Sequence, residues 1–364
     1  MIFAVLTLFS ILTVYSATGT IAYKERGGNT EFYLLKHTVI ILMSVFLAYL
    51  GYLLHYMKYR KVAAVLMLIA IPLLMFTIAF GSEVNQARRW ITLPIIDLTF
   101  QTSDLAKLAL IIWVAKAISS KQEYITDFKS AFLPIIIPII IIVGLIAPAD
   151  LSSALLLFLT TFMMMFIGRV HWKYLGLLIF LGIVVFALMI VVGEFFPDFI
   201  RVDTWVTRLR EFMENRDGGY QVQQGKIAMA NGEWFGLGPG NSTQRNFVPS
   251  PYSDFIYSII IEEYGLLGGF VILGLYVLLF FRTVRLVTKS PRAFGAILAV
   301  GLSLNIVIQA FANMAVSVNL VPVTGLTLPM VSMGGTSLLF TSISFGIILS
   351  VSKYIESIAE TEKA

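Results

Sequence analysis

The sequence predicts an all-α integral membrane protein, a bundle of about ten transmembrane helices with one long external loop between helices 7 and 8. Three observations support this prediction. Of the 364 residues, 58% are hydrophobic and 13% are charged, whereas soluble domains have about 45–50% apolar and about 25% charged residues. Apolar runs of roughly 20 residues, the length of a helix that crosses a bilayer, recur along the chain. A single long polar stretch, about residues 196–253, interrupts them.

The spanning segments follow from this apolar pattern, and we expect residues 1–364 to form one domain. In chain order they are Ile2–Tyr23, His37–Tyr56, Val62–Phe80, Asp104–Ile118, Ala131–Ala147, Leu151–Gly168, Trp172–Phe195, Asp254–Phe281, Ala293–Val316 and Thr336–Tyr354. The first lacks the basic start and cleavage site of a signal peptide, so we interpret it as a retained helix. The fourth is short and carries Lys107 and Lys116. Pro148–Asp150 leaves almost no connection between the fifth and sixth, which predicts a tight hairpin.

Lys and Arg in the short connections indicate the orientation, because cytoplasmic loops are enriched in them. One set of alternate connections and the C-terminal tail carry Lys58, Arg60, Lys61, Lys121, Lys129, Arg169, Lys173, Arg282, Arg285, Lys289, Arg292, Lys353 and Lys363. The other short connections carry Lys24, Arg26, Lys36, Arg88 and Arg89. This asymmetry predicts that both termini are cytoplasmic and that the long loop is external.

The external loop is longer than the 12–15 residues above which loops are usually functional or disordered. It contains Trp205, Phe212, Tyr220, Trp234 and Phe235, and the run Thr204–Glu214 is amphipathic. We therefore expect an ordered loop that lies against the outer membrane surface.

Charged residues inside spanning segments are expensive and are functional hypotheses by default. Asp104 and Lys107 are three residues apart, which places them on one helix face, where they can pair. The pair is either a static bridge or part of a site, and its position alone does not separate the two. For Glu262 and Glu263 in the eighth segment, packing is the favoured interpretation. Asp254 opens that segment after Pro249–Pro251, where a carboxylate also serves as a helix cap.

Polar and glycine-rich stretches mark three further places. Asn305, Gln309 and Asn313 are spaced four apart and form one polar stripe on the ninth segment, either for interhelical hydrogen bonds or as the wall of a hydrated cavity. Gly232–Asn241 lacks the Lys-Ser/Thr of a P-loop but suits a close backbone approach to a ligand or another helix. Thr324–Ser337 contains Pro329, Ser332, Gly334 and Gly335, which predicts a broken backbone buried or lining a cavity.

The sequence lacks the residues that thiol, disulfide and clustered-ligand metal chemistry require. The chain has no cysteine, so thiol and disulfide chemistry is excluded. The sequence contains no HExxH string or clustered ligand set, and we interpret its three histidines as interfacial. We expect no nucleotide, haem or flavin, and no nucleic acid partner.

Several strings in order along the chain resemble the SEDS family (shape, elongation, division and sporulation), which includes FtsW, RodA and SpoVE. They are Val84–Trp90 (VNQARRW), Phe100–Lys107 (FQTSDLAK), Asn246–Tyr257 (NFVPSPYSDFIY), Glu262–Gly265 (EEYG) and Thr324–Ser337 (TGLTLPMVSMGGTS). Phe32–Lys36 and Val84–Trp90 are more similar to the division branch, FtsW, than to the elongation branch. Asp104 stands where the family usually has Glu, and Tyr252–Ser253 replaces His-Thr before the family's essential acid, Asp254.

The resemblance implies a peptidoglycan glycosyltransferase that polymerises lipid II during bacterial cell division and releases undecaprenyl pyrophosphate. It implies a class B penicillin-binding protein, a transpeptidase, as partner, with other divisome membrane proteins. It also implies a place in the bacterial cytoplasmic (inner) membrane at the division septum. The alternatives are a lipid II flippase and a RodA-like elongation polymerase.

Glycosyl transfer to a hydroxyl needs a base, and a pyrophosphate leaving group needs positive charge. We expect Asp254 to be the base or to hold a divalent cation (Mg²⁺ or Mn²⁺). The candidate cations for the leaving group are Lys107, Arg88, Arg89 and Arg245, with Asp104 orienting Lys107. The polar stripe and Ser332, Gly334 and Gly335 are further candidates for substrate binding.

Overall fold

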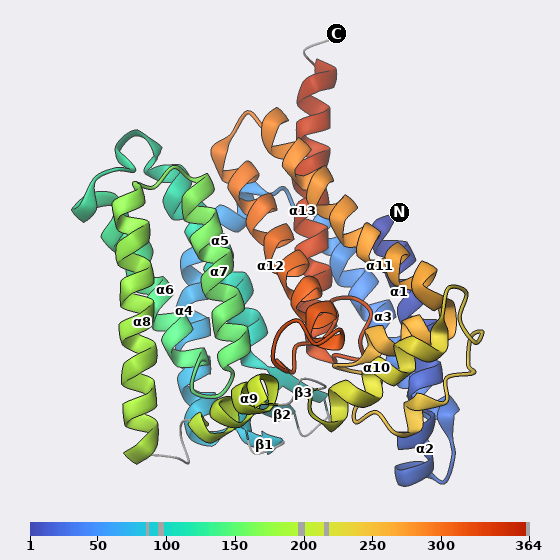
Figure 1. The fold of residues 1–364 in the computed structure, drawn as a ribbon. Helices are drawn as coiled ribbons and strands as arrows, with labels where there is room; N and C mark the ends of the chain where they lie inside the picture. The colour runs from blue at the N-terminus through green and yellow to red at the C-terminus, as the bar shows by residue number, and fades with distance from the viewer. Residues whose placement is uncertain (85–86, 94–97, 196–200, 215–217, 362–364) are drawn as a thin grey trace. The chain divides into compact units, whose positions relative to one another are not determined.

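A computed structural model describes residues 1–84, 87–93, 98–195, 201–214 and 218–361 of the chain (Figure 1). It divides into two compact units, each built from several stretches of sequence. The first unit comprises Met1–Leu47, Trp205–Leu279 and Ile306–Ser342, and the second comprises Ala48–Thr204, Phe280–Asn305 and Ile343–Ala364.

The predicted helical membrane architecture is confirmed. In the described part of the chain, seven helices are long and apolar enough to cross a membrane. They are α3 (Thr30–Leu53), α4 (Met57–Phe80), the continuous stretch of η2 (Phe128–Phe132) and α6 (Leu133–Ile146), α8 (Trp172–Phe195), α11 (Ile256–Lys289), α12 (Ala293–Ser317) and α13 (Thr336–Thr361).

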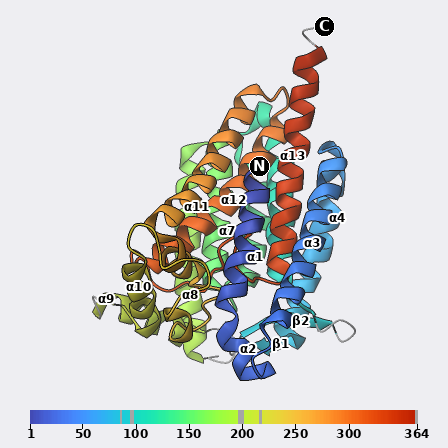
Figure 2. The same ribbon diagram turned by 90° about the vertical axis from the view of Figure 1, so that its right-hand side faces the viewer.

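Three further helices fall where spans are predicted but do not meet both criteria. The helices α1 (Ile2–Ala17) and α7 (Leu151–Ile167) are apolar but shorter. The helix α5 (Thr102–Ser120) carries Asp104, Lys107 and Lys116. A total of about ten spans therefore stays a prediction. The first predicted span ends early, at Thr18, and continues as the polar helix α2 (Gly19–Arg26), which follows α1 in Figure 2.

A small antiparallel sheet, absent from the helical prediction, precedes α5 in the second unit. Its strands are β1 (Ser82–Val84), β2 (Ala87–Leu93) and β3 (Leu98–Gln101), in the order β1-β2-β3. Trp90 lies in the central strand and pairs with Ser82 on one side and Gln101 on the other. Since Gln101 is directly followed by the first residue of α5, the sheet fixes where that helix begins. Short 3₁₀ turns complete the elements, η1 (Gln122–Tyr124) after α5 and η3 (Gln244–Asn246) in the other unit.

The predicted hairpin between α6 and α7 is confirmed in the second unit, and Asp150 forms it. The amide of Asp150 donates to the carbonyl of Ile146 at 2.9 Å, which closes the turn. The Asp150 carboxylate then accepts from the Ser153 amide at 3.1 Å and from the Ser153 hydroxyl at 2.9 Å. This is an N-cap, worth about 1 kcal/mol to the helix that it starts.

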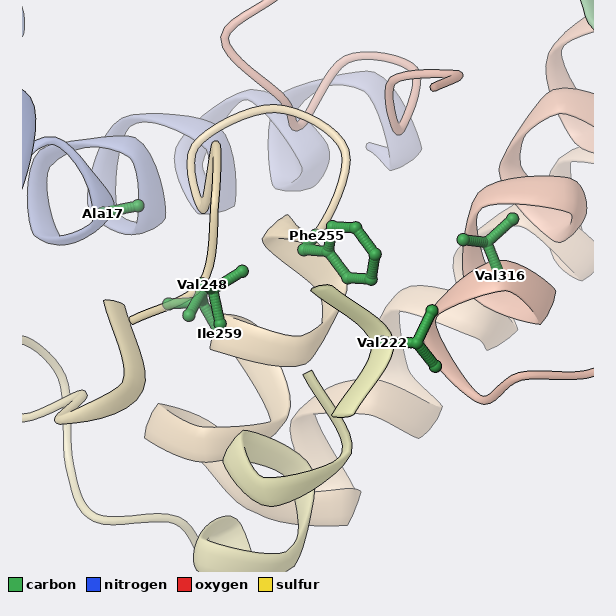
Figure 3. Packing of buried hydrophobic residues seen from close by; sticks show 6 residues of the cluster. All are labelled: Ala17, Val222, Val248, Phe255, Ile259 and Val316. Carbon is green, nitrogen blue, oxygen red and sulfur yellow. The ribbon is translucent and has the colours of Figure 1, made fainter. Parts of the chain in front are cut away.

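The external loop is ordered as predicted where it is described. It contains α9 (Val202–Glu214), which matches the predicted amphipathic run, and α10 (Tyr220–Gly232). In the first unit, Val222 of α10 packs with Ala17, Val248, Phe255, Ile259 and Val316 in a buried hydrophobic cluster (Figure 3). Because Phe255 is fully buried in this cluster, it holds the chain immediately after Asp254 in place. Contact of the loop with the membrane surface stays a prediction.

The glycine-rich stretch approaches a helix closely, as predicted, and that helix is α11. Gly265 has φ of 70° and ψ of −178°, so it breaks α11 and takes its neighbouring backbone groups out of the helical ladder. The loop replaces the lost bonds. Leu237 and Gly238 donate to the carbonyls of Glu262 and Glu263 at 2.9 and 3.0 Å. In return, Leu266 and Leu267 donate to the carbonyls of Glu233 and Trp234 at 2.9 and 3.3 Å. Buried backbone groups that a kink frees must find such partners.

Glu262 fastens the same loop with its side chain, which supports the packing interpretation. The carboxylate is fully buried and accepts from the Ser242 hydroxyl, from the Thr243 amide and hydroxyl at 3.2 and 2.9 Å, and from the Gln244 amide at 3.2 Å. A buried carboxylate is stable when several donors share its charge in this way. Glu262 is therefore an internal anchor of the loop.

One histidine departs from the interfacial interpretation. His37 is fully buried within α3, where its Nε2 lies 2.8 Å from the Ser10 hydroxyl. Ser10 donates its single proton to the Val331 carbonyl at 2.8 Å. The His37 Nε2 must therefore carry the proton that it shares with Ser10.

Candidate active site

The backbone around Asp254 is held by donors from α12 and from the segment between α12 and α13. Three consecutive carbonyls accept one bond each. The Met333 amide donates to Tyr252 at 2.9 Å, the Ser332 hydroxyl to Ser253 at 2.7 Å, and the Asn313 side-chain amide to Asp254 at 2.7 Å. With Phe255 in the core, this turn is fixed on both sides, which is what a residue that does chemistry requires.

The polar stripe of α12 supplies part of this support. Asn313 uses both of its donors, one for Asp254 and one for the Leu326 carbonyl at 2.7 Å. Gln309, one turn earlier, donates to the Thr327 carbonyl at 2.9 Å. Both side chains are hydrogen-bonded, but to backbone carbonyls of non-helical segments rather than to another helix. The hydrated-cavity interpretation stays a prediction. Asn305 belongs to the second unit.

The segment between α12 and α13 is non-helical, as its Pro and Gly residues predict. Gly325 and Gly335 have left-handed φ values of 70° and 55°. The Ser332 hydroxyl accepts from the Leu328 amide at 2.8 Å while it donates to Ser253, so it ties the segment to the Asp254 turn. Gly334 accepts the first bond of the next helix, from the Ser337 amide at 3.1 Å. For Ser332 the structure shows a supporting contact, and substrate contact by Gly334 and Gly335 stays a prediction.

The Asp254 carboxylate lies near Gly325 together with a guanidinium that the sequence does not single out. Its Oδ1 accepts from the Ser253 hydroxyl at 2.8 Å. A Cβ built on Gly325 would lie 3.7 Å from the Asp254 Oδ2 and 3.9 Å from the Nη2 of Arg208. Arg208 belongs to α9, on the external loop. The only sequence signal for it is an Arg between Trp205 and Phe212 on the inner face of an amphipathic helix.

A second charged cluster lies in the other unit. Lys107 pairs with Asp104 at 3.2 Å as predicted, and both side chains are buried. Arg89 pairs with Asp150 at 3.0 Å, next to a cavity of about 20 Å³ that Thr102 and Ser103 also line. Within the described residues, the Asp104 Oδ2 has no hydrogen-bond partner. The Arg88 side chain lies outside the described residues.

Arg245 is engaged away from Asp254. Its Nη1 donates to the Ser16 carbonyl and hydroxyl at 3.2 and 3.1 Å and to the Gly240 carbonyl at 3.0 Å. The Ser16 hydroxyl in turn donates to Glu263. These contacts tie α1 to the glycine-rich stretch, so the structure gives Arg245 a structural role, and its role toward a leaving group stays a prediction.

Asn313→Ala tests whether the support of Asp254 matters. We expect it to lower kcat about tenfold and stability by about 2 kcal/mol, since one buried and one partly buried carbonyl lose their donor at about 1 kcal/mol each. Ser317→Ala is the matched control, because Ser317 is equally buried, one turn away, and bonds only within its own helix, to the Asn313 carbonyl. Turnover and thermal inactivation of both purified variants check this. Equal turnover in the two variants would contradict the positioning role.

The apolar helices, the buried charge pairs and the fixed acidic turn define a multi-pass membrane protein with a candidate site on an irregular segment. The chain belongs to the family of cell cycle proteins named for FtsW, RodA and SpoVE, whose model matches residues 1–357.

Curated relatives are similar over nearly their full length. A protein of Geobacter sp. (strain M18) is 32% identical over 97% of this chain and 95% of its own, and one of Halomonas elongata is 31% identical over 95% and 87%. Both are named "Probable peptidoglycan glycosyltransferase FtsW". Among solved structures, a chain described under "Structural coordination of polymerization and crosslinking by a peptidoglycan synthase complex" is 26% identical, with a TM-score of 0.73 over 97% of both chains. The Thermus thermophilus rod shape determining protein RodA shares the fold, with a TM-score of 0.69 over 97% of this chain and 94% of its own, at 24% identity.

Proposed function

We propose that the protein is a peptidoglycan glycosyltransferase of bacterial cell division that polymerises lipid II into glycan strands. Family membership and the names of the relatives support the activity. The observation that carries the site assignment is the Asp254 turn, in which three successive carbonyls are held by donors from α12 and the segment after it. Such a turn presents one carboxylate in a fixed place.

In the proposed reaction, the acceptor hydroxyl oxygen bonds to the anomeric carbon of the donor sugar, and the bond from that carbon to the pyrophosphate oxygen breaks. Asp254 accepts the proton of the attacking hydroxyl. The Ser253 hydroxyl donates to the Oδ1 of this carboxylate at 2.8 Å. Undecaprenyl pyrophosphate leaves with the bonding electrons, and positive side chains offset its charge.

Lys107 is the proposed cation for the diphosphate, and Asp104 is its positioning partner. Removing one member of a buried pair costs about 3–5 kcal/mol, because the other charge is left uncompensated. We therefore expect Lys107→Met and Asp104→Asn each to lower stability strongly. The double variant is expected to recover stability, since no buried charge is then left alone.

Activity of this double variant separates the two interpretations of the pair. If Lys107 binds the diphosphate, the double variant is stable but at least tenfold less active, because the positive charge is gone. If the pair is only a bridge between structural elements, activity returns together with stability. Thermal inactivation and lipid II turnover, measured on the same purified samples, give the answer.

A divalent cation is the alternative to the base role of Asp254. Asp254 offers one carboxylate with a guanidinium nearby, and Mg²⁺ is commonly held by one or two carboxylates together with substrate phosphates. Within the described residues, no group of three acidic, His or Cys side chains is placed to hold a metal by itself, so such an ion would need the oxygens of the bound diphosphate. We propose the base role for Asp254, with no step through a metal.

The proposed setting is the bacterial inner membrane at the division septum, with both termini in the cytoplasm. The proposed partners are a class B penicillin-binding protein that cross-links the strands and other divisome membrane proteins. The peptidoglycan synthase complex among the structural neighbours supports a cross-linking partner, and the Lys and Arg distribution supports the orientation.

Reconstitution tests the activity. The purified chain in liposomes, given fluorescent lipid II, is expected to produce glycan strands that a muramidase digests. The same liposomes report movement of lipid II between leaflets. Translocation without strands would contradict the glycosyltransferase and favour a flippase.

A further inference from the structure

Helix α9 turns one charged residue inward. Asp203, Arg210, Glu211 and Glu214 of this helix are exposed. Arg208 is half-buried, as are Trp205 and Phe212 one turn to either side of it. A guanidinium on the inner face of an amphipathic helix loses part of its hydration. The groups near it must offset this loss, so they indicate what the guanidinium binds.

Distances from Gly325 locate this guanidinium relative to the Asp254 carboxylate. The three atoms nearest to a Cβ built on Gly325 are the Asp254 Oδ2 at 3.7 Å and the Arg208 Nη2 and Nη1 at 3.9 and 4.0 Å. A carboxylate and a guanidinium therefore border the same point, on a face where residue 325 has no side chain. The φ of 70° at Gly325 favours glycine there and keeps that face open.

These observations point to an anion next to the base. Arg presents a planar fork of donors that matches phosphate oxygens two at a time, and it stays charged at all working pH values. We infer that Arg208 binds a phosphate oxygen of the lipid-linked diphosphate substrate beside Asp254, and that Gly325 leaves the room for it. This inference rests on the proposed function, because it assigns the substrate group that the proposed site takes.

The arrangement also has a consequence for the external loop. Arg208 belongs to α9, so a diphosphate bound by Arg208 beside Asp254 contacts a helix of the loop as well as the turn. Loss of the guanidinium is then expected to weaken substrate binding more than it slows the chemical step.

Arg208→Gln tests this with undecaprenyl pyrophosphate as the probe. We expect the KM for lipid II and the inhibition constant for undecaprenyl pyrophosphate each to rise about tenfold or more. This is the change in affinity that the loss of one charge-assisted hydrogen bond produces. Arg208→Lys should recover part of the loss, and undecaprenol, which lacks phosphate, should bind equally to all variants. Arg210→Gln is the matched control, because Arg210 is exposed on the same helix and pairs only loosely with Glu214, at 3.9 Å.

Gly325→Ala tests the open face independently. The added methyl would lie within 4 Å of both charged groups and would take up space on that face, so we expect it to raise the same two constants. Gly27→Ala controls for backbone strain, since Gly27 has a similar φ of 59° and no atom within 4 Å of the added Cβ. The expected result is weaker substrate binding in Gly325→Ala and unchanged constants in Gly27→Ala.

An unchanged KM and inhibition constant in Arg208→Gln would overturn the inference, even if stability or kcat fell, because a purely structural ion pair predicts that pattern. Direct binding of undecaprenyl pyrophosphate to the purified protein, measured without turnover, keeps the two proposals separate. A wild-type chain that binds the probe through Arg208 but makes no strands would refute the proposed function alone. Strands from wild type with unaltered binding in Arg208→Gln would refute this inference alone.

Discussion

Asp254→Asn is expected to abolish strand synthesis while lipid II still binds. The substitution keeps the size and shape of the side chain but removes its capacity to accept the proton of the attacking hydroxyl. General bases contribute about 10²- to 10⁴-fold to such reactions, so kcat should fall by at least a hundredfold. Lipid II turnover by the purified variant, together with equilibrium binding of lipid II, measures both effects.

Asp254→Glu is the companion variant, since it keeps the base but moves it by one methylene. It is expected to retain measurable activity that lies between those of wild type and Asp254→Asn. The turn at residue 254 is held by Asn313, Ser332 and Phe255. Neither Asp254→Asn nor Asp254→Glu should therefore change the free energy of unfolding by more than about 1 kcal/mol. Near wild-type turnover by Asp254→Asn would show that the base is elsewhere.

Gly236→Ala is expected to destabilise the protein strongly. Its Cβ would lie 2.2 Å from the Glu263 carbonyl oxygen and 2.6 Å from the Gly265 amide nitrogen, so backbone must move. The movement breaks the bonds that replace the helical ladder at the kink of α11. We expect a loss of about 3 kcal/mol or more of stability, seen as early thermal inactivation and poor recovery from the membrane.

Gly240→Ala separates crowding from backbone conformation. Gly240 lies in the same loop with nearly the same φ, 81° against 80°, but nothing lies within 4 Å of its added Cβ. This variant should lose only the roughly 1–2 kcal/mol of a left-handed non-glycine residue. Equal inactivation temperatures for the two variants would mean that the close approach at the kink does not stabilise the protein.

The features that repeat at helical spacing could be predicted from the sequence. Asp104 and Lys107 at i and i+3 form their pair, and Gln309 and Asn313 at i and i+4 both donate to the segment that follows. In each case one helix fixes the geometry, so sequence spacing translates directly into position. The acid at 254 needed the family resemblance, because its position alone fits a helix cap equally well.

Most of the missed features depend on contacts between parts of the chain that are separated in sequence. The kink at Gly265 exists because the glycine-rich stretch supplies its missing hydrogen bonds, and an isolated glycine in an apolar run does not reveal this. Glu262 accepts from Ser242 and Thr243, and both donors belong to the external loop. Arg208 is recognised as a site residue because its guanidinium lies near Gly325 and Asp254, and Gly325 is more than a hundred residues away in the sequence. The sheet before α5 is short, and strand pairing rather than hydrophobic period forms it.

The most direct test uses the chain together with the proposed class B penicillin-binding protein, whose transpeptidase is blocked by a β-lactam. With cross-linking stopped, any glycan ladder made from fluorescent lipid II reports polymerisation alone. Wild-type protein should give a ladder, and Asp254→Asn with the same partner at the same concentration should give none. A ladder of equal length and intensity from both would contradict the central claim that this chain polymerises lipid II at Asp254.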